Sequence, residues 1–233
     1  MARKQSMQQV REDFDRLALL SEEEGWDHNV HYHAFLLGQL PRRLDEAIDI
    51  GCGTGAFARS LADRCRRVLA IDLSPRMVEL ARARSRGHPN IGYEVADANT
   101  WAFPEERSGC AVSITTLHHL PLAPTLANMG GALRSGGTLL VLDLYRPRSA
   151  ADYLAGAVGL PASKAIRLAK TGSLLDGQQS PEVQRAWDEH YASDVFPSLA
   201  GVRAACAEAG LRGAKVRRHL LWRYSVVWRK PAR

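Results

Sequence analysis

Residues 47–58 read AIDIGCGTGAFA, and this stretch decides the fold of the 233-residue chain. The apolar residues before the glycines indicate a short buried strand, and the residues after them indicate the start of an amphipathic helix. Gly51, Gly53 and Gly55 stand at alternate positions, which lets the backbone turn tightly and lets a ligand approach the main chain. The stretch therefore predicts a loop that holds a nucleotide-like molecule.

Asp49, two positions before the first glycine, helps to choose the nucleotide. The loop also fits the dinucleotide pattern G-x-G-x-x-G/A, so the glycines alone do not exclude NAD or FAD. A pyrophosphate would sit against the helix N-terminus, where the Asp49 carboxylate would repel it. A ligand with an ammonium group suits this carboxylate better, and S-adenosylmethionine carries one.

Two further acids follow predicted strands. Residues 68–71 are an apolar, strand-like run that ends in Asp72, which could accept hydrogen bonds from both hydroxyls of a ribose. Asp97 follows a short predicted strand at 91–95 and could accept from an adenine amino group. These acids predict a nucleoside site without choosing between the cofactor families.

Five motifs in order carry a family resemblance: residues 49–55, residues 72–77 (DLSPRM), Asp97, residues 113–120 (SITTLHHL) and residues 136–141 (GGTLLV). Over about residues 45–145 the chain resembles the class I S-adenosylmethionine-dependent methyltransferases of the small-molecule type. The resemblance implies S-adenosyl-L-methionine as cofactor. The site that it implies consists of Asp49, Gly51, Cys52, Gly53, Gly55, Asp72, Leu73, Met77, Asp97, Ala98, Ile114 and Thr115.

The pattern of elements predicts an α/β fold in one domain, residues 1–233. Strands near 46–50, 68–72, 91–95, 110–115 and 138–143 alternate with helical segments, which favours a parallel sheet with helices on both faces. With the family resemblance, we expect a Rossmann-like, seven-stranded, mostly parallel sheet closed by an antiparallel C-terminal hairpin, with strands at 216–224 and 225–228. We divide the chain into an N-terminal helical cap (1–44), a cofactor-binding core (45–145), a helical lid insertion after the fifth strand (146–196) and a closing helix and hairpin (197–233).

Composition is that of a globular protein, with 45% hydrophobic and 24% charged residues and no apolar run long enough to span a bilayer. The N-terminus lacks a signal core, and the four cysteines show no metal or redox spacing, so we expect a cytoplasmic protein, monomeric or homodimeric. The net charge of +6 raises the question of nucleic acid, but the arginines are scattered along helices. Residues 115–118 (TTLH) also replace the Asn/Asp-Pro-Pro-aromatic motif of base-modifying relatives, so a nucleic-acid partner is not favoured.

Histidines are the candidate catalytic residues. Methyl transfer requires alignment of the nucleophile, the methyl group and the sulfonium, and an imidazole could remove a proton from the acceptor. His118 and His119 follow the fourth strand, and His190 ends the lid; packing is the alternative role for each. No metal is expected, because His28, His31 and His33 lack a completing ligand. The predicted substrate pocket consists of His31, Tyr32, Tyr145, Trp187 and Tyr191.

The leading hypothesis is methyl transfer from S-adenosylmethionine to an O, N, S or activated C of a small molecule. Three alternatives stay open: a cofactor-binding or interaction module without catalysis, a nucleic-acid methyltransferase, and an NAD-dependent reductase. Tight NADH binding would favour the last, and cofactor binding without turnover would favour the first.

Overall fold

A computed structural model describes residues 5–20, 29–150, 152–154, 159, 168 and 180–232. One sheet of seven strands has the order β3-β2-β1-β4-β5-β7-β6, and only β7 runs antiparallel to its neighbours. The strands are β1 (Leu44–Ile50), β2 (Cys65–Asp72), β3 (Ile91–Val95), β4 (Ser108–Ile114), β5 (Leu133–Leu144), β6 (Lys215–Arg218) and β7 (Arg223–Arg229). The predicted mostly parallel sheet with a C-terminal antiparallel hairpin is confirmed.

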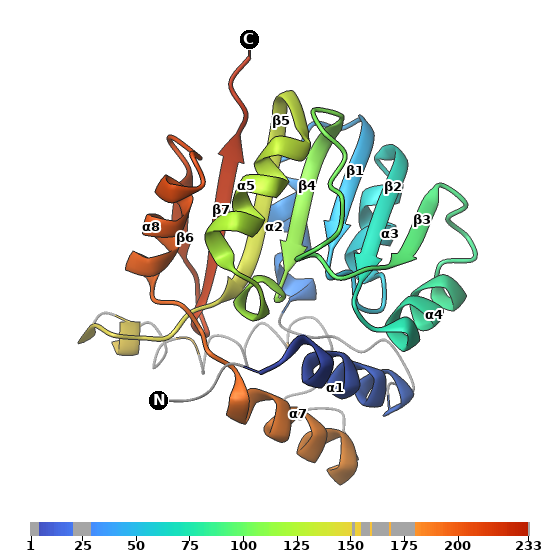
Figure 1. The fold of residues 1–233 in the computed structure, drawn as a ribbon, viewed down its shortest axis with the longest axis vertical. Helices are drawn as coiled ribbons and strands as arrows, with labels where there is room; N and C mark the ends of the chain where they lie inside the picture. The colour runs from blue at the N-terminus through green and yellow to red at the C-terminus, as the bar shows by residue number, and fades with distance from the viewer. Residues whose placement is uncertain are drawn as a thin grey trace.

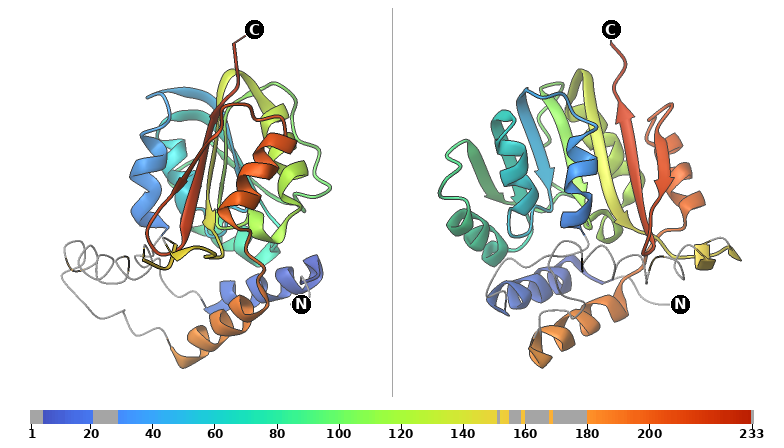
Figure 2. Two further views of the ribbon diagram at one scale, coloured as in Figure 1. Left: turned by 90° about the vertical axis from the view of Figure 1, so that its left-hand side faces the viewer. Right: turned by 180° about the vertical axis from the view of Figure 1, so that it is seen from behind.

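Helices cover both faces of the sheet, as Figures 1 and 2 show. They are α1 (Met7–Leu20), α2 (Val30–Leu37), α3 (Ala56–Ala62), α4 (Pro75–Arg84), the short 3₁₀ helix η1 (Leu117–His119), α5 (Leu122–Ala132), α7 (Pro181–Ser193) and α8 (Leu199–Glu208). One apolar cluster joins α5 and α8 to the sheet, and a second joins α2 and α3 to the opposite face. The glycine loop lies between β1 and α3, at the carboxyl end of β1, which is the third strand of the sheet.

Local signals explain where several helices begin. Ser74 caps α4 by accepting a hydrogen bond from the backbone N–H of Met77, and Pro75 opens the helix. Ser180 caps α7 in the same way, with Pro181 in its first turn. A serine followed by a proline therefore fixes the start of both helices.

The hairpin differs from its prediction in one respect. The expected first strand ran from 216 to 224, but β6 ends at Arg218 and the chain turns before β7 begins at Arg223. Leu221 and Trp222 both have a φ near +55° there, and Trp222 is 40% exposed instead of packed in the core. The turn was not predicted because its side chains are mostly apolar and continue the strand-like pattern.

Helices α1 and α7 lie side by side below the carboxyl ends of the parallel strands in Figure 1. The N-terminal region and the end of the predicted lid therefore meet at the edge of the sheet where ligands bind in open α/β folds. Most of the remaining lid, within 151–179, lies outside the described residues. None of the described helices is long and apolar enough to cross a membrane.

Candidate active site

The glycine loop is shaped by its neighbours at two of its three glycines. Gly51 has a φ of +72°, and a Cβ added there would lie 2.1 Å from Oγ1 of Thr116. Gly55 has a φ of +79°, and its Cβ would lie 2.3 Å from the hydroxyl of Tyr93. Gly53 also has a positive φ of +51°, but nothing lies within 4 Å of the position of its Cβ. The loop therefore leaves open space beside Gly53, where a ligand could approach the main chain.

Asp49 is a buried carboxylate with no counterion among the residues that the structure describes. It is 2% exposed, and its Oδ2 atom has no hydrogen-bond partner within the described part of the chain. Burial, with a smaller contribution from the nearby Asp72 carboxylate, raises the pKa of Asp49 to about 7. This position would be stabilised by a cation placed beside Asp49.

Asp72 ends β2 and holds the glycine loop from the other side. Its carboxylate accepts hydrogen bonds from the backbone N–H of Gly53 (2.8 Å) and of Ser74 (2.9 Å). Burial raises the pKa of Asp72, although these two hydrogen bonds oppose the shift. Asp72 thus connects the end of β2 to both adjacent loops. Its negative charge also contributes to the raised pKa of Asp49.

Helix α1 covers the beginning of α4. The Asp15 carboxylate accepts hydrogen bonds from the Ser74 hydroxyl (2.5 Å) and from the backbone N–H of Arg76 (3.2 Å). Met77 is buried in a small apolar cluster with residues of α1. Between α1 and the loop after β2 lies a hollow of about 530 Å³, lined by Met7, Gln8, Arg11, Glu12, Asp15 and Leu73.

The other predicted cofactor residues lie on the same edge of the sheet. Asp97 is half-buried after β3, and its Oδ1 accepts from the backbone and the side-chain N–H groups of Asn99. Thr115 follows β4 with a φ of +54° and donates its hydroxyl to Oδ1 of Asn29 (3.1 Å). Cys52 and Ala98 are buried and Ile114 is half-buried. Burial raises the pKa of the Cys52 thiol well above its usual value, which argues against a nucleophilic role.

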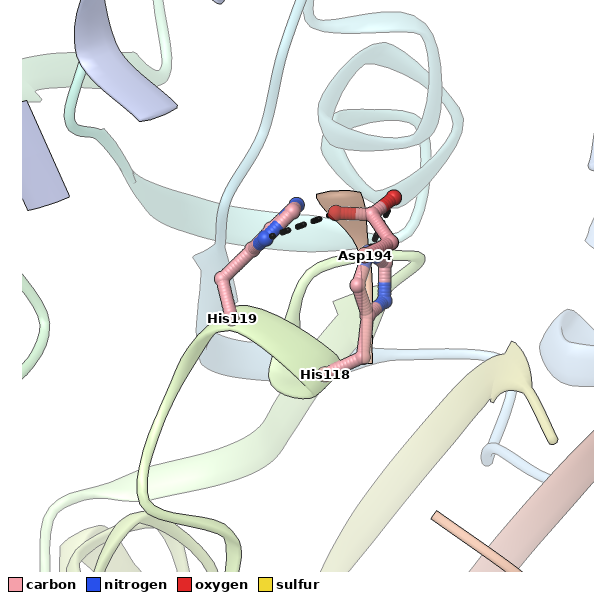
Figure 3. A group of neighbouring side chains, drawn as sticks. All are labelled: His118, His119 and Asp194. Carbon is pink, nitrogen blue, oxygen red and sulfur yellow. Dashed lines mark ion pairs between the residues drawn. The ribbon is translucent and has the colours of Figure 1, made fainter. Parts of the chain in front are cut away.

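The three candidate catalytic histidines converge on one carboxylate, that of Asp194, which follows α7. His118 Nε2 lies 3.6 Å from Oδ2 of Asp194, His190 Nε2 lies 3.7 Å from Oδ2, and His119 Nδ1 lies 3.5 Å from Oδ1. Figure 3 shows His118 and His119 on η1 with Asp194 facing them. The Asp194 side chain is fully buried.

Two more carboxylates contact the Nδ1 atoms of His118 and His190, on the side of each ring away from Asp194. Nδ1 of His118 lies 2.7 Å from Oδ1 of Asp143, and Nδ1 of His190 lies 3.1 Å from Oδ2 of Asp13. Burial disfavours the imidazolium, but the Asp143 and Asp194 carboxylates together outweigh it, and the pKa of His118 is raised to about 9. Burial and the neighbouring His118 lower the pKa of His119 to about 3. The two adjacent imidazoles thus differ sharply in protonation.

The predicted substrate-pocket residues fall into separate groups. Trp187 and Tyr191 stack on each other on α7, with ring centroids 5.4 Å apart. His31 and Tyr32 lie on α2, where the Tyr32 hydroxyl reaches the carbonyl of Leu220 in the hairpin turn. Tyr145 is 2% exposed and belongs to the apolar cluster under α5 and α8. The described residues do not bring all five together.

Several residues at this edge were not found by sequence reasoning. Asp194 stands 75 positions after His119, and Asp13 and Asp143 gave no motif of their own. Asn29 was missed as well, although its Oδ1 accepts from both Thr115 and Arg223. The only available signal was positional, because Asp143 ends a predicted strand at the ligand-binding edge.

Comparison with known proteins agrees with this geometry. A family model described as a methyltransferase domain matches residues 47–137. An uncharacterized methyltransferase of Mycobacterium tuberculosis is 31% identical over 213 residues, which cover 90% of this chain and 99% of the relative. A trans-aconitate 2-methyltransferase of Methylobacterium radiotolerans is 34% identical over 150 residues, 58% of this chain and 56% of the relative.

The fold has solved counterparts. The N-methyltransferase NodS from Bradyrhizobium japonicum, in complex with S-adenosyl-L-homocysteine, has a TM-score of 0.62 at 18% identity and covers 95% of this chain and 98% of its own. A mostly parallel sheet of this order with a glycine loop after β1 defines a Rossmann-like methyltransferase fold. The chain belongs to the class I S-adenosylmethionine-dependent methyltransferases. The predicted family and cofactor are confirmed.

Proposed function

We propose that this methyltransferase transfers the methyl group of S-adenosylmethionine to an O, N, S or activated C of a small molecule. Asp49, Gly53 and Asp72 would hold the cofactor, with the ammonium group near Asp49 and the open space beside Gly53 occupied by the methionine portion. The remaining cofactor residues that the resemblance implies stay part of this proposal.

The observation that carries the cofactor site is the buried, unpartnered Asp49 carboxylate. Its pKa near 7 reflects the cost of an anion that is buried beside a second carboxylate and has no positive partner among the described residues. The ammonium group of S-adenosylmethionine supplies that charge. A pyrophosphate cofactor would instead add negative charge beside two buried carboxylates, so the NAD alternative is disfavoured.

The cover formed by α1 and α7 supports a small acceptor. Phe14 on α1 packs edge-on against His119 and His190, with centroids 5.9 and 4.8 Å apart. These histidines are nearly inaccessible from outside in the described structure. A small molecule can be enclosed beneath such a cover, whereas a base in a long polynucleotide would require the cover to open.

The acid–base role of the histidines remains a proposal within this function. His119 is neutral because its pKa is lowered to about 3, so it could accept a hydrogen bond from an acceptor without a competing proton. His190 stands beside it, with ring centroids 5.2 Å apart. Either imidazole would orient an acceptor; substitution of each by Gln, with kcat and KM measured separately, would distinguish orientation from proton removal.

Calorimetric titration with S-adenosylmethionine, S-adenosylhomocysteine and NADH tests the cofactor. We expect binding of both adenosyl ligands, weak or no binding of NADH, and a large loss of affinity in Asp49→Asn. Asp45→Asn is the matched control, because Asp45 lies on the same strand but is exposed. Equal affinity in Asp49→Asn and Asp45→Asn would remove Asp49 from the site.

A panel of small-molecule acceptors, followed by release of S-adenosylhomocysteine, tests the reaction. Turnover on a metabolite and none on tRNA or DNA would support the proposal. Turnover on a nucleic acid alone would overturn the small-molecule class. Cofactor binding without turnover on any of these acceptors would favour the non-catalytic module.

A further inference from the structure

Asp194 is a buried carboxylate surrounded by imidazole nitrogens that do not form hydrogen bonds with it. The three N···O separations are 3.5, 3.6 and 3.7 Å, longer than an ordinary N–H···O hydrogen bond. Both oxygens of Asp194 and Nε2 of His119 lack a hydrogen-bond partner within the described part of the chain. Such a group is costly to bury unless something else satisfies it.

The separations match those of ligands that share one metal ion. Two ligands bound tetrahedrally at zinc distances stand about 3.3–3.4 Å apart. One nitrogen from each of His118 and His119 and one oxygen of Asp194 all lie within 4.8 Å of one another. The two N···O separations are already close to that value, so a rearrangement of these side chains could bring the three groups onto a common ion.

The two ring nitrogens of His118 face different carboxylates. A carboxylate can only accept, so the 2.7 Å contact with Asp143 requires a proton on Nδ1 of His118, and Nε2 is the nitrogen that faces Asp194. His190 has the same arrangement, with Asp13 at Nδ1 and Asp194 opposite Nε2. Carboxylates behind metal-binding histidines commonly fix the tautomer in this way.

A buried carboxylate that faces an imidazole nitrogen is stabilised when a cation lies between the two groups. A small cavity of about 10 Å³ adjoins these groups, lined by Gln5, Val10, His118, His119, Ser193, Asp194 and Val195. This volume is about the size of one water-sized particle. The cation could be a proton on His118 or a bound metal ion.

We propose that His118 Nε2, His119 Nδ1 and the Asp194 carboxylate bind one divalent transition-metal ion, of which Zn²⁺ is the best match. Two imidazoles and one carboxylate are a donor set of borderline softness, which suits Zn²⁺ better than Mg²⁺ or Ca²⁺. His190 Nε2 faces the same carboxylate but lies outside the group whose ligand atoms are all within 4.8 Å of one another. The proposal goes beyond methyl transfer and departs from the sequence-based expectation that no metal is bound.

Such an ion would join two parts of the chain that are distant in sequence. Asp194 directly follows α7, whereas His118 and His119 form η1 after β4. Binding would therefore fasten the end of α7 to the sheet edge, and it would stabilise the folded state by mass action. We expect a rise in melting temperature with Zn²⁺, independent of any methyl acceptor.

The test uses the full chain, free of affinity tag and stripped with a chelator. Calorimetry with Zn²⁺ and visible absorption with Co²⁺ should each give one ion per chain. Asp194→Asn and His119→Gln should each weaken binding at least ~tenfold. Mg²⁺ should not compete.

His88→Ala is the matched control, because His88 Nε2 lies 3.6 Å from Asp63 in a similar but single pair outside the cluster. Circular dichroism and S-adenosylhomocysteine binding, measured on every variant, would show that each protein is folded. Absence of stoichiometric Zn²⁺ and Co²⁺ binding by folded wild type would leave the proton as the cation and overturn the proposal. Equal binding by wild type and Asp194→Asn would do the same, by locating the ion elsewhere. Loss of the adenosyl ligand alone would count against the proposed function and not against the metal.

Discussion

We expect Asp49 to set the pH dependence of cofactor binding. Its pKa in the free protein is about 7, and the bound cofactor's ammonium group would favour the ionised form. Near pH 6 the free protein must release a proton before it binds, so we expect affinity for S-adenosylhomocysteine about tenfold weaker near pH 6 than near pH 8. Calorimetry in buffers of different ionisation enthalpy would measure both the affinity and the released proton. A flat profile in wild type would contradict this, and Asp49→Asn should lack the Asp49-linked proton release.

A comparison of substitutions at Gly53 and Gly136 would distinguish the effect of backbone strain from the effect of blocking a ligand. Both have a positive φ, and both have open space around the position of a Cβ, but only Gly53 lies in the glycine loop. We expect Gly53→Ala and Gly136→Ala to lose similar stability, about 1 kcal/mol each, because alanine is strained at positive φ. Only Gly53→Ala should weaken binding of S-adenosylhomocysteine, by at least ~tenfold, because its methyl group occupies the approach path. Equal affinities by calorimetry would mean that the space beside Gly53 holds no ligand.

At the residue scale, the sequence predicts what is local and misses what is brought together. The glycines and Asp49 lie within seven residues, and their spacing alone indicates a nucleoside site. Asp194 could not be assigned, because a single aspartate after a helix resembles an ordinary surface residue. Asp194 approaches the histidines only because α7 packs near η1, and no local sequence pattern predicts that packing.

At the scale of elements, α1 and α7 act as one unit. Phe14 contacts Trp187 and His190 of α7 and His119 of η1, each in an edge-on arrangement. An exposed pair, Arg16 and Glu189, adds a 2.7 Å contact that contributes little because solvent screens it. The aromatic contacts of Phe14, together with the contact between Asp13 and His190, therefore link the two helices to each other and to the sheet edge.

We expect Phe14→Ala to loosen both helices together. Loss of a large, partly buried aromatic residue costs about 2–4 kcal/mol of local stability. Hydrogen exchange followed by mass spectrometry should show faster exchange in α1 and α7, with amides of β1 and β4 unchanged. Leu19→Ala on the same helix is the control, because Leu19 is 71% exposed. Faster exchange in α1 alone would show that the two helices are not coupled through Phe14.

The hairpin shows how an element boundary escapes sequence analysis. The five parallel strands were predicted to within a few residues, because each contains an apolar run that stands out from its flanking segments; the exception is β5, which begins five residues earlier than predicted. Residues 219–222 (HLLW) contain no glycine, proline, asparagine or aspartate, so no turn signal interrupts the apolar run. The turn is imposed by pairing of β7 with β5, which places Tyr224 opposite Asp143.

For the whole molecule, Asp49 creates a conflict between stability and binding. Its pKa in the folded state lies above the unfolded value of 3.8, so the native state holds the proton more tightly, and stability falls as pH rises from about 4 to about 7. Above that range Asp49 is ionised in both states, and the buried charge lowers the free energy of unfolding by its full amount. Without ligand near pH 8, Asp49→Asn should therefore be more stable than wild type, by ~1–3 kcal/mol.

Ligand should reverse this order. S-adenosylhomocysteine at 100 times its dissociation constant stabilises wild type by about 2.7 kcal/mol, which corresponds to a rise in melting temperature of roughly 5–10 °C for a chain of this size. Asp49→Asn should gain little, since its cofactor affinity is lost. Scanning calorimetry of both proteins, with and without ligand, would show whether the order of their melting temperatures reverses. If the variant instead melted below wild type without ligand, or gained the same shift with it, the buried carboxylate would be a structural residue, and the cation that balances it would have to be sought elsewhere.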